Sequence, residues 1–73
     1  MSTATNTTRV SVNGEFRSVP PGTTLDALVA TVSSAPSGVA AAVNETVVPR
    51  GDWSRTALAE GDRVEILTAV QGG

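Results

Sequence analysis

The chain has 73 residues, a length that suits one small domain near the lower limit for folding on a single apolar core. It contains no cysteine and no histidine, which excludes disulfides, thiolate metal sites and the commonest general base. All five positive charges are arginines, so no side-chain amine is present and an autonomous enzyme is not expected. The net charge of −2 and the two aromatic residues argue against nucleic-acid binding.

Targeting signals are also absent from the sequence. No apolar run approaches the length of a membrane span, and the first seven residues lack the basic start and apolar block of a signal peptide. These seven residues are small and polar, so we expect a disordered tail over residues 1–7. We expect a soluble, cytoplasmic protein.

A β-hairpin is predicted at the start of the folded part. Val10 and Val12 alternate with polar residues, and Asn13-Gly14 then separates them from a second alternating segment. Asn-Gly in this position is the strongest short-range hairpin signal, because both turn residues tolerate positive φ. The predicted strands are Thr8–Val12 and Glu15–Val19.

A short amphipathic helix is predicted over Leu25–Val32. Pro20-Pro21-Gly22 ends the strand before it, because proline supplies no donor to a sheet. Thr23 or Thr24 can cap the helix, and Asp26 brings a carboxylate to its first turn. The apolar residues fall at i, i+3, i+4 and i+7, and they are Leu25, Leu28, Val29 and Val32.

Two more strands are predicted after a loop at residues 33–38. Val39–Val43 is an apolar run of strand length, although its alanines leave a helix possible. Asn44-Glu45 is typical of a tight turn, with Asn44 in the left-handed region. A strand over Thr46–Val48 follows, and Pro49 stops it.

The chain reaches its last strand through two turns. Residues 51–55 predict an irregular turn or a single 3₁₀ turn, and residues 60–62 predict a polar turn. Alternation along the last strand places Val64 and Ile66 in the core, and Leu67 points outward. The element order β-β-α-β-β-β predicts an α+β domain over residues 8–68, a mixed sheet with one helix across one face. The last strand would pair beside the first, in the interior of the sheet.

The five residues 69–73 form the predicted functional segment. Gly72 and Gly73 have no Cβ, so they make the thinnest tail a polypeptide can have, and an extended segment of this length reaches at most about 17 Å. We expect a flexible tail that carries the Gly73 carboxylate into a partner's active site. Two glycines alone are more typical of a frayed end, so the rest of the sequence has to support the functional interpretation. The candidate partner-binding residues are Leu67, Ala69, Val70, Gln71 and Arg50.

Several segments match one pattern that covers about residues 8–73. Pro-Arg-x-x-Trp followed by Glu-Gly-Asp and then Gly-Gly at this spacing is specific, whereas Gly-Gly alone is not. The matching segments are Val12 to Glu15, Val39 to Asn44, Val48 to Trp53, Leu58 to Ile66 and Ala69 to Gly73. In these segments the chain resembles the ThiS family, the sulfur carriers of bacterial thiazole biosynthesis. It departs from the pattern in its longer N-terminal tail and in Gln71.

The resemblance implies a ubiquitin-like β-grasp fold and a sulfur-carrier cycle. A ThiF-like adenylyltransferase would adenylate the Gly73 carboxylate with ATP and magnesium, and this chain would bind no cofactor or metal itself. A sulfur donor, either a cysteine desulfurase or sulfide, would convert the adenylate to a thiocarboxylate. A ThiG-like thiazole synthase would then receive the sulfur, with Gly72 threading the partner's channel. By itself the chain is expected to be a monomer.

The other functional candidates have simpler interpretations. Trp53 is better explained as a core residue than as a partner-binding anchor. Arg50 fits an acidic partner surface and a solvated position equally well. The carboxylates of Glu60, Asp62 and Glu65 are better explained by a solvated turn than by acid–base work or a cation site.

Two other functions fit the same composition. One is the small subunit of a molybdopterin synthase, which resembles the first in fold and in its Gly-Gly end. The other is a non-catalytic β-grasp interaction module whose glycines do no chemistry. The short chain and the Pro-Arg-x-x-Trp segment favour the thiazole pathway.

Overall fold

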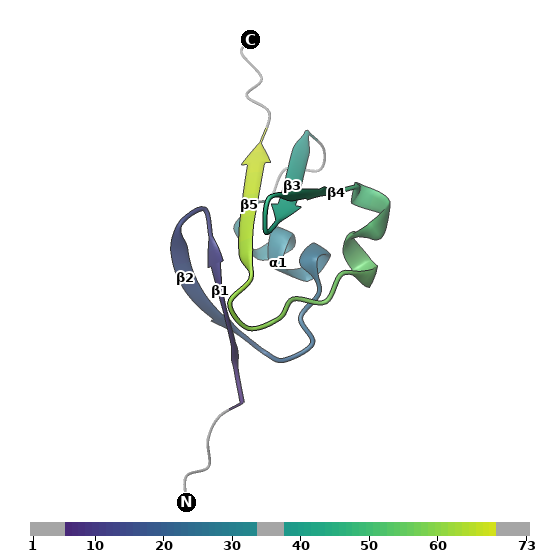
Figure 1. The fold of residues 1–73 in the computed structure, drawn as a ribbon. Coiled ribbons are helices and arrows are strands. Elements are labelled where there is room, and N and C mark those ends of the chain that lie inside the picture. The colour runs from purple at the N-terminus through teal and green to yellow at the C-terminus, as the bar shows by residue number, and fades with distance from the viewer. Residues whose placement is uncertain (1–5, 34–37, 69–73) are drawn as a thin grey trace, which may run out of the picture.

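A computed structural model describes residues 6–33 and 38–68 of the chain. These residues form a five-stranded mixed sheet, with one α-helix and one 3₁₀ helix packed against it (Figure 1). The predicted α+β class is therefore confirmed. The predicted tails and loop fall largely on residues 1–5, 34–37 and 69–73, which lie outside the described residues.

The last strand lies at the centre of the sheet. Strand order is β2-β1-β5-β3-β4, and β5 runs parallel to β1 and antiparallel to β3. The predicted pairing of the last strand beside the first is confirmed. The strands are β1 (Thr8–Val12), β2 (Glu15–Val19), β3 (Val39–Val43), β4 (Thr46–Val48) and β5 (Arg63–Thr68).

A tight turn connects the two strands of each antiparallel hairpin, and both turns contain asparagine at positive φ. Asn13 (φ 51°) and Gly14 (φ 88°) join β1 to β2, and Asn44 (φ 51°) and Glu45 (φ 72°) join β3 to β4. Positive φ at both central positions is the geometry of a two-residue turn whose twist matches the flanking strands. Both predicted turns are confirmed, as is the strand over residues 39–43 for which a helix was also possible.

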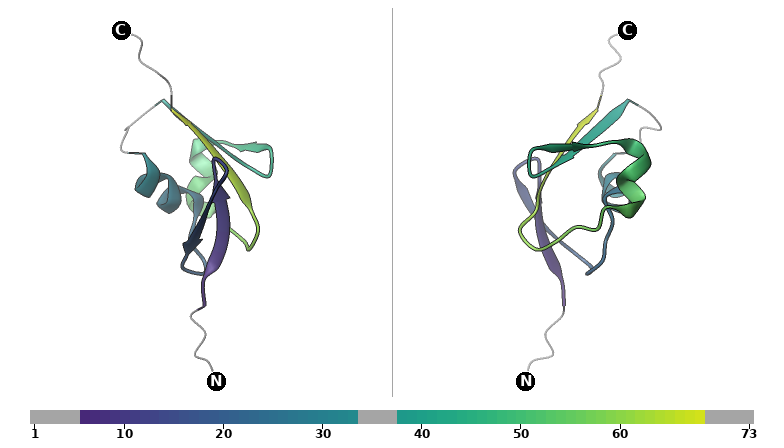
Figure 2. Two further views of the ribbon diagram at one scale, coloured as in Figure 1. Left: turned by 90° about the vertical axis from the view of Figure 1, so that its left-hand side faces the viewer. Right: turned by 45° about the vertical axis from the view of Figure 1, so that its right-hand side comes forward.

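Helix α1 (Leu25–Val32) lies across one face of the sheet (Figure 2). Its apolar stripe is buried at Leu25, Leu28 and Val29. The start of the helix differs from the prediction in one respect. Thr24 occupies the capping position, but its hydroxyl donates to the Asp26 carboxylate and does not accept from a helix amide. The Asp26 carboxylate itself accepts the N–H of the next residue at 2.9 Å.

The 3₁₀ helix η1 (Arg50–Arg55) brings the only tryptophan of the sequence into the core. The Trp53 side chain is buried, and its indole N–H donates to the Val48 carbonyl at 2.9 Å. A buried indole needs a partner of this kind, because an unsatisfied polar group in the core is costly. The prediction that Trp53 is a core residue is confirmed.

The core lies between the sheet and the two helices. Val64 and Ile66 of β5 are buried as predicted, whereas Leu58 was not assigned to the core and is buried too. Leu58 follows an irregular segment whose pattern has no period, so only its tertiary neighbours place it inside. The buried apolar residues are Val10, Val12, Leu25, Leu28, Val29, Ala41, Trp53, Leu58, Val64 and Ile66.

One substitution at two positions tests this assignment of core and surface. Leu28→Ala should lower the free energy of unfolding by about 2–5 kcal/mol, because it leaves a cavity in a small core. Leu67→Ala, the same chemical change at a side chain that is 70% exposed, should change it by less than about 0.5 kcal/mol. Denaturant unfolding of both variants measures the difference, and equal losses would contradict the assignment.

Candidate functional site

Strand β5 carries the chain toward the predicted functional segment. It is paired with β1 at its start and with β3 as far as Thr68, the last residue before that segment. The structure thus defines the base from which the segment starts. The predicted site residues beyond this base lie outside the described residues, and they are Ala69, Val70, Gln71, Gly72 and Gly73.

An asparagine side chain holds β5 near each end. The Oδ1 atom of Asn13 accepts the Ile66 N–H at 2.8 Å, and its Nδ2 donates to the Ile66 carbonyl at 3.1 Å. The Oδ1 atom of Asn44 accepts the Arg63 N–H at 3.0 Å, and its Nδ2 donates to Asp62 at 3.0 Å. The sequence assigned both asparagines to turns alone, so it missed these contacts. The one signal available was asparagine at two turns where glycine would also fit.

The face of the sheet opposite α1 carries exposed apolar side chains. Leu67 is 70% exposed, so its predicted outward orientation is confirmed. Opposite residues on antiparallel strands point to the same face, and Ala40 lies opposite Leu67 while Ala42 lies opposite Val47. The two alanines are short, so a shallow hollow forms between Leu67 and Val47, with Glu65 on its lining. We call these four apolar residues the apolar hollow.

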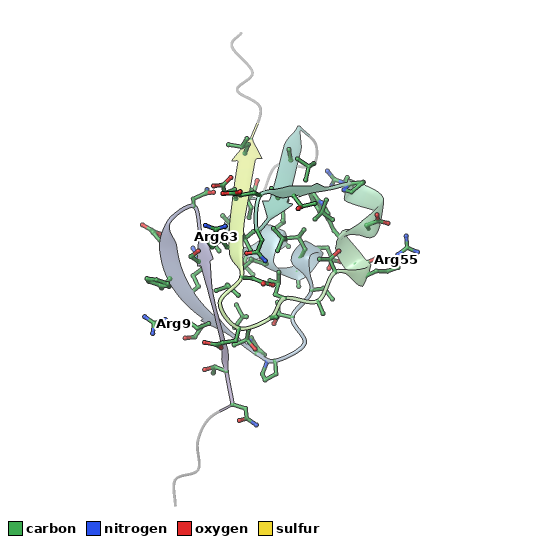
Figure 3. The ribbon with its side chains drawn as sticks, viewed as in Figure 1. Arg9, Arg55 and Arg63 are labelled. Atoms are coloured by element: carbon green, nitrogen blue, oxygen red, sulfur yellow. The ribbon has the colours of Figure 1, made fainter. Side chains whose placement is uncertain are left out.

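Charged side chains lie on the β1–β2 half of this face and at the border of the apolar hollow, which Glu45 and Glu65 also line. The Arg9 guanidinium lies 4.6 Å from the centre of the Phe16 ring, and the backbone N–H of Arg9 donates to the Glu60 carboxylate at 2.9 Å. Arg63 lies 3.7 Å from Glu45, and both side chains are largely exposed. Figure 3 shows Arg9 on β1 and Arg63 on β5. Arg55, on η1, lies at the right-hand edge of the view, away from Arg9. Such exposed pairs contribute little to stability.

Arg50 lies on a different surface from Leu67. Its guanidinium lies 5.1 Å from the centre of the Trp53 ring, and the two side chains line a groove between α1 and η1. Leu67 lines the apolar hollow on the sheet face. The structure therefore does not bring these two predicted partner-binding residues together. The stacking of Arg50 on Trp53 was not among the predicted roles of Arg50.

The carboxylates near the 60–62 turn have structural roles. Asp62 accepts the Ala59 N–H at 2.8 Å and closes the turn, in addition to its contact with Asn44. Glu60 accepts the Arg9 N–H. Within residues 6–33 and 38–68, no cluster of acidic residues is arranged to hold a metal ion. Across those same ranges no helix has the length and apolar character needed to cross a membrane.

Comparison with known proteins gives a consistent match over nearly the whole chain. The ThiS family model matches residues 10–73. The sulfur carrier protein ThiS of Escherichia coli (strain K12) is 25% identical over 65 residues, covering 89% of this chain and 98% of that protein. The crystal structure of the thiamine biosynthesis protein (ThiS) from Geobacter metallireducens has a TM-score of 0.72 and 26% identity, covering 89% of this chain and 99% of the other.

A longer protein matches as well. A thiazole synthase from Magnetococcus marinus is 35% identical over 65 residues, which cover 89% of this chain. The match covers 20% of that protein, so the chain spans about a fifth of its length.

The mixed sheet with one helix across it places the chain among the ubiquitin-like β-grasp proteins. The family model covers well over half of the sequence, and the chain belongs to the ThiS family. It is a sulfur carrier protein of thiamine biosynthesis and not an enzyme.

The burial of Trp53 has a direct spectroscopic consequence. Because it is the only tryptophan, its fluorescence reports one environment. We expect emission shifted to shorter wavelength than in the unfolded chain, with weak quenching by acrylamide, since the side chain is 5% exposed. The same protein in denaturant serves as the control. Emission and quenching equal to those of the unfolded chain would contradict the core position.

Proposed function

We propose that the carboxylate of Gly73 is the group that carries sulfur. The family match that extends through residue 73 is the observation that carries this proposal. The paired strand β5, which ends five residues earlier, supports it by providing a fixed base for the carboxylate. Gly72 contributes a backbone without a side chain, which suits passage through a narrow channel.

The chemistry requires activation by a partner. An α-carboxyl group is ionised at neutral pH, and a carboxylate is a poor electrophile. In the proposed cycle a ThiF-like adenylyltransferase uses ATP and magnesium, the carboxylate attacks the α-phosphate, and pyrophosphate leaves. Sulfide would displace AMP and leave a thiocarboxylate on Gly73 directly. The persulfide sulfur of a cysteine desulfurase would instead displace AMP to form an acyl disulfide, and a second thiol would reduce that disulfide, forming a disulfide with the desulfurase cysteine and releasing the Gly73 thiocarboxylate. This chain lacks the glycine-rich phosphate-binding motifs that such a reaction needs, so the partner supplies them.

A ThiG-like thiazole synthase is the proposed acceptor of the sulfur. In the Magnetococcus relative, a segment similar to this chain belongs to a protein named as a thiazole synthase. A carrier and a synthase that act on each other need to meet repeatedly, and joining them raises their effective concentration. The relative therefore supports a partnership between this chain and a synthase of that class.

The apolar hollow is the proposed docking surface for the partner. Its residues Leu67 and Val47 are among the most exposed large apolar side chains of the described residues, and Leu67 lies next to the strand end. Exposed apolar groups close to one another are typical of protein interaction sites. Docking at this position would set the distance over which residues 69–71 extend, so Ala69, Val70 and Gln71 are proposed to line the partner's channel.

Substitution of the two last glycines tests the carrier function. Gly73→Ala and Gly72→Ala should fold normally yet load poorly, because a side chain crowds the attacking sulfur and the channel wall. Intact-mass spectrometry after incubation with ATP, sulfide and the adenylating partner measures the exchange of one oxygen for sulfur. Normal yield from both variants would contradict the proposal. A chain with one residue added after Gly73 separates a carrier, which fails to load, from a docking module, which still binds.

The docking surface is tested by a matched pair of substitutions. Leu67→Asp should weaken binding to the adenylating partner at least about ten-fold, as expected for a central interface residue. Phe16→Asp makes the same kind of change at a side chain of equal exposure, on the β1–β2 half of the face, and should have a smaller effect. Isothermal titration measures both. A greater loss for Phe16→Asp would move the docking surface to the β1–β2 half.

A further inference from the structure

Strand β5 extends well beyond its parallel partner. The β1–β5 pairing consists of two residue pairs, Ser11 with Arg63 and Val12 with Val64. β1 then ends at Val12, whereas β5 continues to Thr68. Within the described residues, no strand covers this edge of β5 after Val64. The last two thirds of the strand would therefore be paired on one side alone, by β3.

Asn13 extends the pairing along this edge. Its backbone N–H donates to the Val64 carbonyl at 2.9 Å, as the next rung of the ladder. Its side chain then bonds both polar backbone groups of Ile66, at 2.8 and 3.1 Å. A side-chain amide has the same donor and acceptor as a peptide group, so it can replace one residue of a neighbouring strand. One residue outside β1 thus contributes three hydrogen bonds to β5.

The turn alone does not require asparagine at this position. The backbone of residue 13 has φ 51°, a conformation that glycine adopts more easily than any other residue. Glycine would satisfy the turn but would leave Ile66 without its partner on this edge. The amide is therefore the property that distinguishes Asn13 from glycine here.

Ile66 directly precedes Leu67, which belongs to the proposed docking surface and lies one residue before the end of β5. On the β3 edge, Leu67 is paired with Ala40. With Asn13 on the opposite edge at Ile66, both edges of β5 are held almost to Thr68. Without Asn13, only β3 holds the end of the strand, so this end can rotate about its β3 edge. Such a rotation would change the direction in which the chain leaves β5.

We propose that Asn13 is a positioning residue for sulfur loading, which fixes the direction in which β5 delivers the C-terminal segment to the adenylating partner. The inference rests on the proposed function of Gly73. Asn13 touches neither the carboxylate nor the partner in this account. It acts through Ile66, so its loss should affect the reaction step more than the binding step.

Asn44 provides a control within the same strand. It also has φ 51° in a two-residue turn, and it also contributes three hydrogen bonds near β5, from its backbone N–H to Arg63 and from its side chain to Arg63 and Asp62. These contacts are at the start of β5, far along the strand from Thr68. Asn44→Gly therefore removes the same chemistry without loosening the delivering end.

The test compares Asn13→Gly with Asn44→Gly in the partner-dependent adenylation of the full chain, measured by pyrophosphate release at varied carrier concentration. We expect roughly ten-fold lower kcat for Asn13→Gly with little change in KM, because misplacement by about 1 Å can cost on the order of 100-fold in rate. Asn44→Gly should retain a kcat close to that of the unsubstituted chain. Equal kcat values for the two variants would overturn the inference.

Amide hydrogen exchange at Ile66 gives a second, independent measurement. Asn13→Gly should speed exchange at Ile66 several-fold relative to Asn44→Gly, because it removes the acceptor of that amide. Unchanged exchange would overturn the inference even if loading fell. If the unsubstituted chain itself does not load, the proposed function fails, and the exchange measurement still decides whether Asn13 holds the strand.

Discussion

The structure depends on the position of β5 between β1 and β3. Its two neighbours come from the start and the middle of the sequence, so this one strand joins the N-terminal hairpin to the β3–β4 hairpin. The same strand places Val64 and Ile66 in the core and Leu67 on the opposite face. β3 pairs with this strand along most of its length, while the other edge is held by β1 at its start and by Asn13 at Ile66. Stability and delivery of the C-terminal segment therefore depend on the same six residues.

The two faces of the sheet have different compositions for a physical reason. The face under α1 carries the large buried side chains that a domain of this size needs to fold at all. Among residues 6–33 and 38–68, no helix lies over the opposite face (Figure 2), and its large apolar side chains are exposed. Exposed apolar side chains that lie close together favour association with other proteins, and such patches are typical of interaction sites. Ala40 and Ala42 keep the centre of that face low, in the region that we propose as the docking surface.

The regular elements were predictable because their signals are local. The alternation in β1 and β2, the Asn-Gly turn and the apolar stripe of α1 each lie within a few residues of one another, and the observed boundaries of these elements match. The outward position of Leu67 followed from alternation in the same way. Gly72 and Gly73 were chosen from the pattern of the whole sequence, and their role stays a prediction.

The remaining features depend on residues far apart in the sequence. The contact between Asn13 and Ile66 spans 53 positions, and no local period predicts it. The burial of Leu58 likewise depends on its tertiary neighbours. The contact of Arg50 with Trp53 is different, because it lies within η1 between residues three positions apart. Thr24 shows the opposite case, since its capping role was inferred from sequence but the neighbouring Asp26 carboxylate takes its hydroxyl instead. In that case the competing contact is itself local, since Asp26 lies two positions after Thr24.

The parallel pairing of β1 with β5 also bears on how the chain folds. Strand β5 is the last of the five to be synthesised, yet it belongs at the centre of the sheet. Until it has left the ribosome, the β1–β2 and β3–β4 hairpins have no strand to join them. The loop between β1 and β5 must close before their pairing gives any stability, and such non-local pairing slows folding. The nascent chain therefore exposes the apolar face of both hairpins until its final strand is complete.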